Sequence, residues 1–322
     1  MQLTPEQDAL ARLLFPRDMN ARDELARTNG RFVHYTSAEV AVSILQNRSV
    51  WMRNALTMND FREVEHGLAA LQGAYSDDEA GGLLKSVLNS IAPGFIGNLE
   101  TLFDSWLPHF RQDTFLTCLS EHSASEDTLG RLSMWRAYGG QSGVALVVNN
   151  TPFTADTNNL GAYSSAVAYL NPEEFTAEFK VIAQKMDANR ALLAALPLDQ
   201  LLSSLFAMLR FAVLATKHPG FKEEREWRII YSPAIDKSKV ITPAFATIRG
   251  IPQQIYQIPL LNSPENGLVN ANISDLLDRL IIGPTTQPLT LYKTFVAILT
   301  EAGVQNAADK VFVSEIPLRE AT

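Results

Sequence analysis

Two carboxylates and an arginine alternate in the stretch Glu224 to Arg228, which reads EREWR. On a strand, alternation would send Glu224, Glu226 and Arg228 to one side. If this side of the strand faced a cleft, one of the carboxylates could accept a hydrogen bond from a sugar hydroxyl and stabilise a developing oxocarbenium ion. The arginine would keep that carboxylate ionised. The alternative is an edge strand whose charges are solvated and cross-paired.

A second polar group, His34-Tyr35-Thr36-Ser37, stands where a short strand is expected to give way to a helix. His34 and Thr36 would share one face of the strand end and donate hydrogen bonds to a ribose or phosphate, with Tyr35 stacked or packed behind them. The alternative makes His34 a core histidine bonded to the backbone and Ser37 a helix cap. The residue types alone leave both interpretations open.

The third stretch, Trp135 to Gly140, places Trp135 and Tyr138 on one face of an expected short helix that two glycines end. Such aromatic pairs are usually core residues, yet the glycines would let a ligand ring approach the backbone beside Tyr138. The five histidines lack metal-ligand spacing, so no metal is expected. No P-loop, GxGxxG or GxSxG motif occurs either.

The elements that must position these groups are predicted from hydrophobic periodicity. Residues 31–54 read as strand, helix, strand, and 143–149 as a buried strand with 162–169 as its neighbour. Further strands are expected at 114–120, 223–231, 241–248, 255–261, 280–283 and 310–314, and helices at 5–15, 129–138 and 289–302. Asp60 and Glu63 would form a capping box at the start of a helical insertion. We therefore predict an α+β fold with a largely antiparallel sheet.

The predicted organisation is an N-terminal helical segment over residues 1–30 and one α+β domain over 31–322, with helical insertions at about 61–110 and 172–216. The 322 residues carry a net charge of −8, which argues against a broad nucleic-acid-binding surface. A local basic groove could still use Arg53, Arg131 and Arg136. A single cysteine, no secretion signal and no apolar run long enough for a membrane span favour the cytoplasm.

In order and spacing, several landmarks resemble the uncharacterised bacterial domain-of-unknown-function family 2971. The resemblance runs from residue 32 to 319 and implies no activity by itself. Its landmarks are His34-Tyr35-Thr36, Val50-Trp51-Met52, Asn59-Asp60 with Glu63, Phe115 to Ser120, Trp135 with Tyr138 and Gly139, Glu224-x-Glu226-x-Arg228, and Ser314-x-Ile316-Pro317-x-Arg319.

A more distant resemblance is to the ADP-ribosyltransferase superfamily. It implies that His34 holds the nicotinamide ribose of NAD and that Glu226, with Glu224 in a Glu-x-Glu arrangement, directs cleavage of the nicotinamide–ribose bond. The aromatic that stacks on the ligand would be Trp51 or Tyr138, and no metal would be needed. Residues expected to bind the cofactor are Tyr35, Thr36, Ser37, Trp51, Tyr138 and Arg228. The acceptor of ADP-ribose would be a protein, a nucleic acid or water.

Two hypotheses of other classes stand beside the transferase. One is a non-catalytic module that senses a nucleotide in the same cleft, in phage defence or a stress response. The other is a nuclease or other hydrolase that uses Glu224, Glu226 and Asp60 with a divalent ion. Binding without turnover would favour the first, and metal-dependent activity would favour the second.

Overall fold

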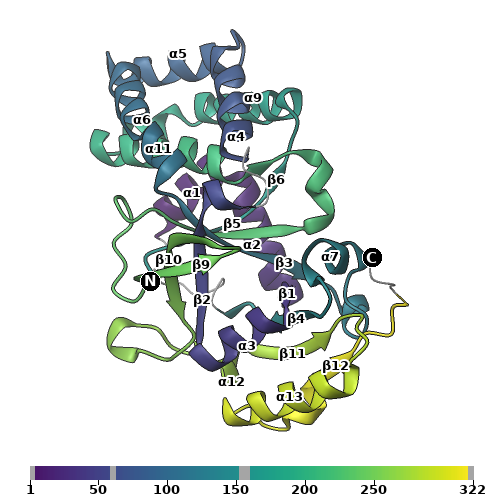
Figure 1. Ribbon diagram of the computed structural model, residues 1–322. Coiled ribbons are helices and arrows are strands. Elements are labelled where there is room, and N and C mark those ends of the chain that lie inside the picture. The colour runs from purple at the N-terminus through teal and green to yellow at the C-terminus, as the bar shows by residue number, and fades with distance from the viewer. Residues whose placement is uncertain (1–3, 59–62, 152–159, 318–322) are drawn as a thin grey trace.

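The computed structural model describes residues 4–58, 63–151 and 160–317. Its described residues form a ten-stranded, mainly antiparallel sheet with helical layers, which confirms the predicted α+β class (Figure 1). Along the sheet the strands run β12-β11-β4-β1-β3-β2-β10-β9, while β8 pairs with the other edge of β3 and β5 pairs with β8. The strands are β1 Arg31–Ser37, β2 Ser49–Asn54, β3 Phe115–His122, β4 Gly143–Val148, β5 Tyr163–Ala166, β8 Glu226–Tyr231, β9 Thr242–Ile248, β10 Ile251–Pro259, β11 Leu277–Ile282 and β12 Val311–Val313.

Strand β3 is the branch point of this sheet. One of its edges pairs with β8 over six residues, from Phe115 to Ser120. The other edge is divided, because β1 pairs only with its last residues, Ser120 to His122, and β2 only with Phe115 and Leu116. Strands β1 and β2 therefore diverge, and the middle of β3 lies in the split between them.

Each face of the sheet has its own cover. Residues directly opposite one another on paired strands point to the same side, so Val33, Ser120 and Glu226 share a face. We call this the insertion face, because Leu116 and Ile230 on the same side pack into the large core of the insertion helices. The other side, where Phe32 packs edge-on against Trp227, is the opposite face.

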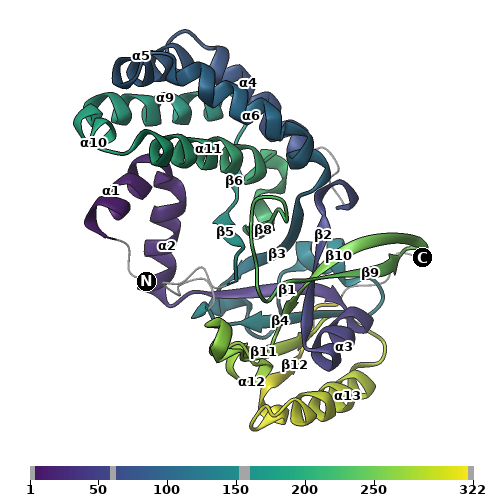
Figure 2. The same cartoon turned by 90° about the vertical axis from the view of Figure 1, so that its left-hand side faces the viewer.

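Two helical insertions form one layer over part of the insertion face, at the top of Figures 1 and 2. They contribute most of the apolar core, and the pairs α4·α9, α5·α9 and α4·α11 are in contact. The described helices of the insertions are α4 Glu63–Ser76, α5 Gly81–Ile91, α6 Phe95–Gln112, α9 Pro172–Ala188, α10 Arg190–Ala194 and α11 Leu198–Leu214. A two-stranded parallel ribbon, β6 Ala168–Tyr169 and β7 Thr216–Lys217, joins this layer to the sheet.

Shorter helices cover the rest of the sheet. On the opposite face, α3 Ala38–Asn47 and α13 Pro288–Glu301 pack on β4 and β11. On the insertion face, Met134 and Trp135 pack on β1 and β4. The remaining helices are α1 Pro5–Leu14, α2 Pro16–Thr28, α7 Leu132–Met134, α12 Ile273–Leu276, the π-helix η3 Trp135–Gly139, and the 3-10 turns η1 Ala55–Thr57, η2 Ala124–Glu126, η4 Pro219–Glu224, η5 Pro264–Asn266 and η6 Ala307–Lys310.

Local signals in the sequence account for several element ends. Thr4 and Gln7 form a reciprocal capping box at the start of α1. Ser37 caps α3 by accepting the amide of Val40 at 3.3 Å. The capping box expected from Asp60 lies outside the described residues.

Two strand predictions were wrong. Strand β4 does not neighbour residues 162–169; it lies between β1 and β11, and β5 pairs with β8. Strand β8 begins at Glu226 rather than at residue 223, because residues 219–224 form a 3-10 turn and Arg225 adopts a left-handed conformation with φ 44°. Glu224 therefore precedes the strand instead of alternating with Glu226 along it.

Candidate functional site

A chain of charged and phenolic side chains lies on the insertion face at the start of β8. The ammonium of Lys217 donates to Glu224 Oε2 at 2.7 Å and to Glu226 Oε2 at 3.0 Å. Arg228 Nε donates to Glu226 Oε1 at 2.8 Å, and the hydroxyl of Tyr138 donates to Glu224 Oε1 at 2.9 Å. We call these five residues the β8 network.

The network is positioned by backbone on both sides of β8. Lys217 lies opposite Tyr169 in the β6–β7 ribbon, and the hydroxyl of Tyr169 accepts the amide of Glu226 at 2.7 Å. The turn that carries Glu224 is held by Arg131, whose guanidinium donates to the carbonyls of Glu223 at 2.7 Å and Glu224 at 3.3 Å. The two glutamates thus meet at one lysine although only one of them is on the strand.

Electrostatics keep the inner carboxylate charged. Burial alone would raise the pKa of Glu226, but the positive charges of Arg228 and Lys217 outweigh it and the pKa is lowered. The neighbouring side chain of Cys118 lowers the pKa further. Glu226 is therefore an anion at neutral pH in spite of its burial.

The phenols of the site stay protonated. Burial, and then the neighbouring Glu224, raise the pKa of Tyr138, so its hydroxyl remains a donor. Burial likewise raises the pKa of Tyr169. The site thus combines acceptor carboxylates, fixed cations and neutral hydroxyl groups, which is the set of partners that a polyhydroxylated ligand uses.

The network becomes more accessible from Glu226 toward Glu224. The Glu226 side chain is 6% exposed and that of Glu224 is 16% exposed. Next to them, the ring of Phe221 is 4.6 Å from the Lys217 ammonium, and Phe221 is 37% exposed. The partly exposed ring of Phe221 and the less buried of the two carboxylates lie at the more exposed end of the network, which we call its open end.

The polar corner at residues 34–37 is built differently. His34 alternates with Val33 and so lies on the opposite face from Glu226. Its Nδ1 lies 3.1 Å from the carbonyl of Cys118, one of the β3 residues in the split between β1 and β2. Burial lowers the pKa of His34, so the ring is neutral and Nδ1 carries the proton it donates. The histidine thus bonds to the backbone of the neighbouring strand β3, as the alternative interpretation predicted.

The other corner residues also have structural contacts. Tyr35 is buried, its ring packs edge-on against Trp135 at 4.8 Å, and its hydroxyl accepts the amide of Arg131 at 2.8 Å. Thr36 lies opposite Val144 on the face of His34. The Ser37 hydroxyl caps α3, as the alternative interpretation predicted.

The sequence left two aromatic candidates open, and both lie on the side of Glu226. Tyr138 is bonded to Glu224. Trp51 alternates with Met52 and shares a face with Arg53, which is paired opposite Leu116. The structure therefore brings Glu224, Glu226, Arg228 and Tyr138 into one network, places Trp51 on the same face, and separates His34.

Sequence reasoning missed three residues of the site: Lys217, Tyr169 and Phe221. Lys217 follows a long apolar helix and precedes the glutamates by seven and nine residues. A lone lysine directly after an apolar helix could have indicated a charged partner nearby, because Lys is almost never fully buried without one. Tyr169 had no such signal, since only the pairing of β6 with β7 brings it to Glu226.

The network leaves little room for a metal between its carboxylates. The Lys217 ammonium already bridges Glu224 and Glu226, at the position a shared cation would need. Among the described residues, no group of three or more His, Cys, Asp and Glu side chains could hold a metal ion. Asp60, the third carboxylate of the hydrolase hypothesis, lies outside them.

Two of the three arginines expected to line a basic groove make hydrogen bonds within the protein. Arg131 is held by Glu126 at 3.0 Å and by backbone carbonyls, so its charge is balanced. Arg136 is exposed on η3. The guanidinium of Arg53 donates to the carbonyl of Thr57 at 2.7 Å.

In the described part of the chain, no helix combines the length and apolarity needed to cross a membrane.

Comparison with known proteins gave one match. Residues 134–229 match the model of a family described as protein of unknown function, DUF2971. The matched segment contains every member of the β8 network together with Tyr169, and it excludes the corner at residues 34–37. Neither the comparison with curated proteins nor that with solved structures found a match.

Proposed function

We propose that the protein binds a ribose-bearing nucleotide at the open end of the β8 network. The observation that carries this is the Tyr138–Glu224–Lys217 arrangement. A half-buried carboxylate, 16% exposed and fixed by a lysine, can accept hydrogen bonds from the two vicinal hydroxyls of a ribose. Tyr138 can turn its hydroxyl from Glu224 to the ligand.

The neighbouring groups suit the rest of such a ligand. Phe221 offers a partly exposed ring for a base or a nicotinamide. Lys217 lies beside this ring, but its charge is balanced by Glu224 and Glu226, so recognition would rest on hydrogen bonds and ring packing. Binding without turnover fits the inner carboxylate, because Glu226 is only 6% exposed and is held by both Arg228 and Lys217.

Isothermal titration calorimetry with NAD and with ADP-ribose tests this proposal. Wild-type protein should bind, and Glu224→Gln, which keeps the shape of the side chain and removes its charge, should weaken binding roughly tenfold or more, because hydrogen bonds to charged groups contribute about 1.5–3 kcal/mol. Glu178→Gln changes an exposed carboxylate elsewhere and is the matched control. Equal affinity of Glu224→Gln and wild type for both ligands would refute the proposal.

A second candidate function is NAD-dependent ADP-ribosyl transfer. The ionised Glu226 favours it, because a fixed negative charge stabilises an oxocarbenium-like ribose when the bond to nicotinamide breaks. Electrons of that bond leave with nicotinamide, and a nucleophile on the acceptor or a water molecule attacks the ribose carbon. His34 has no part in this version.

Release of nicotinamide from NAD, followed by chromatography, distinguishes the two candidates. A transferase should release it at a rate that falls at least 100-fold in Glu226→Gln, as expected when a charge-stabilising group is removed. Binding in calorimetry with no release by wild type would identify a binding module and exclude the transferase.

A further inference from the structure

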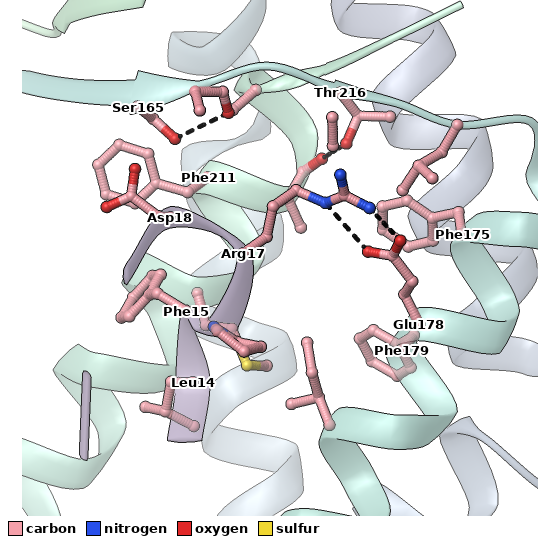
Figure 3. A pocket seen from close by; sticks show the side chains of 18 residues that line it. Leu14, Phe15, Arg17, Asp18, Ser165, Phe175, Glu178, Phe179, Phe211 and Thr216 are labelled. Atoms are coloured by element: carbon pink, nitrogen blue, oxygen red, sulfur yellow. Dashed lines mark hydrogen bonds and ion pairs between the residues drawn. The ribbon is translucent and has the colours of Figure 1, made fainter. Parts of the chain in front are cut away.

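Two cavities border the insertion helices, and they differ in charge. Figure 3 shows a cavity of about 120 Å³ between the α1–α2 turn, α9 and α11. The charged side chains that line it are paired, because Arg17 is bound to Glu178 and Asp18 accepts Arg22 Nε at 2.7 Å. The second cavity, of about 260 Å³, lies between α4, α6 and α11. Its charges are not balanced in this way.

The wall of the second cavity comes mainly from two antiparallel helices. Tyr75, at the end of α4, bonds to Glu100, near the start of α6. Glu65, near the start of α4, pairs with Arg111, near the end of α6. The two helices therefore run in opposite directions, and both pack on α11. Side chains three or four residues apart share a helix face, and the apolar ones that line the cavity are Leu68 and Leu71 of α4, Leu99, Phe103 and Leu107 of α6, and Leu209 of α11.

Two carboxylates line this cavity without an ion pair. Glu100 and Asp104 are exposed and lie four residues apart on α6, where like charges repel each other. Within the described part of the chain, Glu100 accepts the neutral hydroxyl of Tyr75 at 2.8 Å, and Asp104 is in no ion pair. The ammonium of Lys85 donates instead to the carbonyl of Tyr75 at 3.0 Å. Arg111 lines the other end of the cavity, so the end beside Tyr75 carries the unbalanced negative charge.

The volume and the wall of the cavity define the body of a ligand. An engineered apolar cavity of about 150 Å³ holds one benzene molecule, so a cavity of about 260 Å³ has room for two fused rings. The rings of Phe103 and Tyr75 line it and can pack against such a ligand. Because Glu100 and Asp104 are exposed, a cationic group can reach both carboxylates while the fused rings are buried.

We propose that this cavity binds an aromatic monoamine, a molecule with a two-ring apolar body and a short arm that ends in an ammonium group. The rings pack among the leucines and Phe103, and the ammonium lies between Glu100 and Asp104. One cation at this position reduces the repulsion between the two carboxylates, which a neutral ligand does not do. The site uses no residue of the β8 network, so it does not depend on the proposed nucleotide site.

Tryptamine and 3-propylindole test this proposal as matched probes, because they differ only in an ammonium group in place of a methyl group. Isothermal titration calorimetry at low salt should show that tryptamine binds about threefold more tightly, and added salt should reduce this preference. An apolar site without charge would prefer 3-propylindole. Equal or tighter binding of 3-propylindole at low salt would therefore overturn the role of the carboxylates.

Nuclear Overhauser effects locate the bound probe. The indole protons of tryptamine should show them to the methyl groups of Leu68 and Leu107, which line the cavity on its two helices. Leu280, in the core on the opposite face of the sheet, is the internal control and should show none. If neither Leu68 nor Leu107 shows an effect with either probe, the site is wrong.

Two variants sharpen the result. Asp104→Asn keeps the side-chain shape and removes its charge, so it should weaken tryptamine binding about threefold and leave the affinity for 3-propylindole unchanged. Asp309→Asn, which changes an exposed carboxylate on η6, is the matched control and should bind both probes like the wild type. An unchanged affinity of Asp104→Asn for tryptamine would overturn the role of Asp104.

Leu107→Trp should fill the cavity and weaken the binding of both probes at least tenfold. Circular dichroism checks that this variant is folded. Wild-type affinity in the folded variant would overturn the site. If the variant does not fold, the nuclear Overhauser effects and the Asp104→Asn titrations still decide between the outcomes.

Discussion

The corner at residues 34–37 and the β8 network are both polar clusters at strand ends, but their side chains have different partners. In the corner, His34 bonds to the carbonyl of Cys118 and Ser37 to the amide of Val40. In the network, Lys217 bridges two carboxylates and Tyr138 bonds to one of them. The corner residues bond mainly to backbone groups, whereas the network residues bond mainly to one another, although Arg228 also donates to the carbonyl of Leu214 at 2.7 Å.

This difference separates structural from functional polar groups. Polar side chains that satisfy backbone atoms can be explained by the fold alone. Buried charges that only neutralise one another lower stability relative to well-packed apolar residues, so their retention calls for another reason. Four substitutions test the contrast, from the largest expected effect to the smallest.

Lys217→Met should have the largest effect on stability. It would leave Glu224 and Glu226 close together without the cation between them, and breaking a buried ion pair costs about 3–5 kcal/mol. The free energy of unfolding by urea measures this loss. Lys180→Met removes the lysine of an exposed pair with Glu79 and should change stability by less than about 1 kcal/mol. Similar losses of stability in the two variants would contradict the view that the charges of the network are buried and depend on one another.

His34→Leu should lower stability by about 1–3 kcal/mol, because it removes the hydrogen bond between the His34 ring and the Cys118 carbonyl, which leucine cannot replace. The lowered pKa adds a pH dependence: the wild type should be fully stabilised above the unfolded pKa near 6.5 and lose stability as the pH falls below it. Urea titrations at pH 7.5 and pH 5.5 should show a smaller difference for the variant. The variant should bind the nucleotide with the affinity of the wild type. Weaker binding would show that His34 is part of the binding site.

Ser37→Ala should cost about 1 kcal/mol, the usual loss when a helix loses its N-cap. Thermal unfolding followed by circular dichroism checks the value. Thr4→Ala, which removes the cap of α1, is the matched control and should cost a similar amount. A much larger loss in Ser37→Ala would show that this serine does more than cap α3.

Tyr138→Phe should reduce stability least, by less than about 1 kcal/mol, since it removes one partly exposed hydrogen bond and keeps the ring. Its effect on ligand binding should be greater than its effect on folding. Comparison of urea midpoints with calorimetric affinities for ADP-ribose separates the two. If the variant loses only this much stability and still binds ADP-ribose like the wild type, Tyr138 is not part of the nucleotide site.

Local features were predictable from the sequence because they depend on neighbouring residues. The cap at Ser37 and the helical insertions follow from a hydroxyl group and from apolar spacing within a few residues. The carboxylates Glu224 and Glu226 were also found. Their partner Lys217 was not, since its role depends on how β7 and β8 are placed relative to each other.

For the same reason, the sequence could not predict on which face of the sheet His34 lies. Alternation within β1 puts His34 and Val33 on different sides, but only the register with β3 and β8 shows which side carries Glu226. The split between β1 and β2 depends on long-range pairing too. A resemblance based on the order of motifs could therefore name the residues but not bring them to one cleft.

The central claim, that the network and not the corner is the functional site, is tested most directly by a crystal structure of the protein with ADP-ribose. We expect electron density for a ribose whose hydroxyls lie within hydrogen-bond distance of Glu224, with a ring against Phe221. A ribose bound to His34 and Thr36, on the opposite face of the sheet, would contradict it.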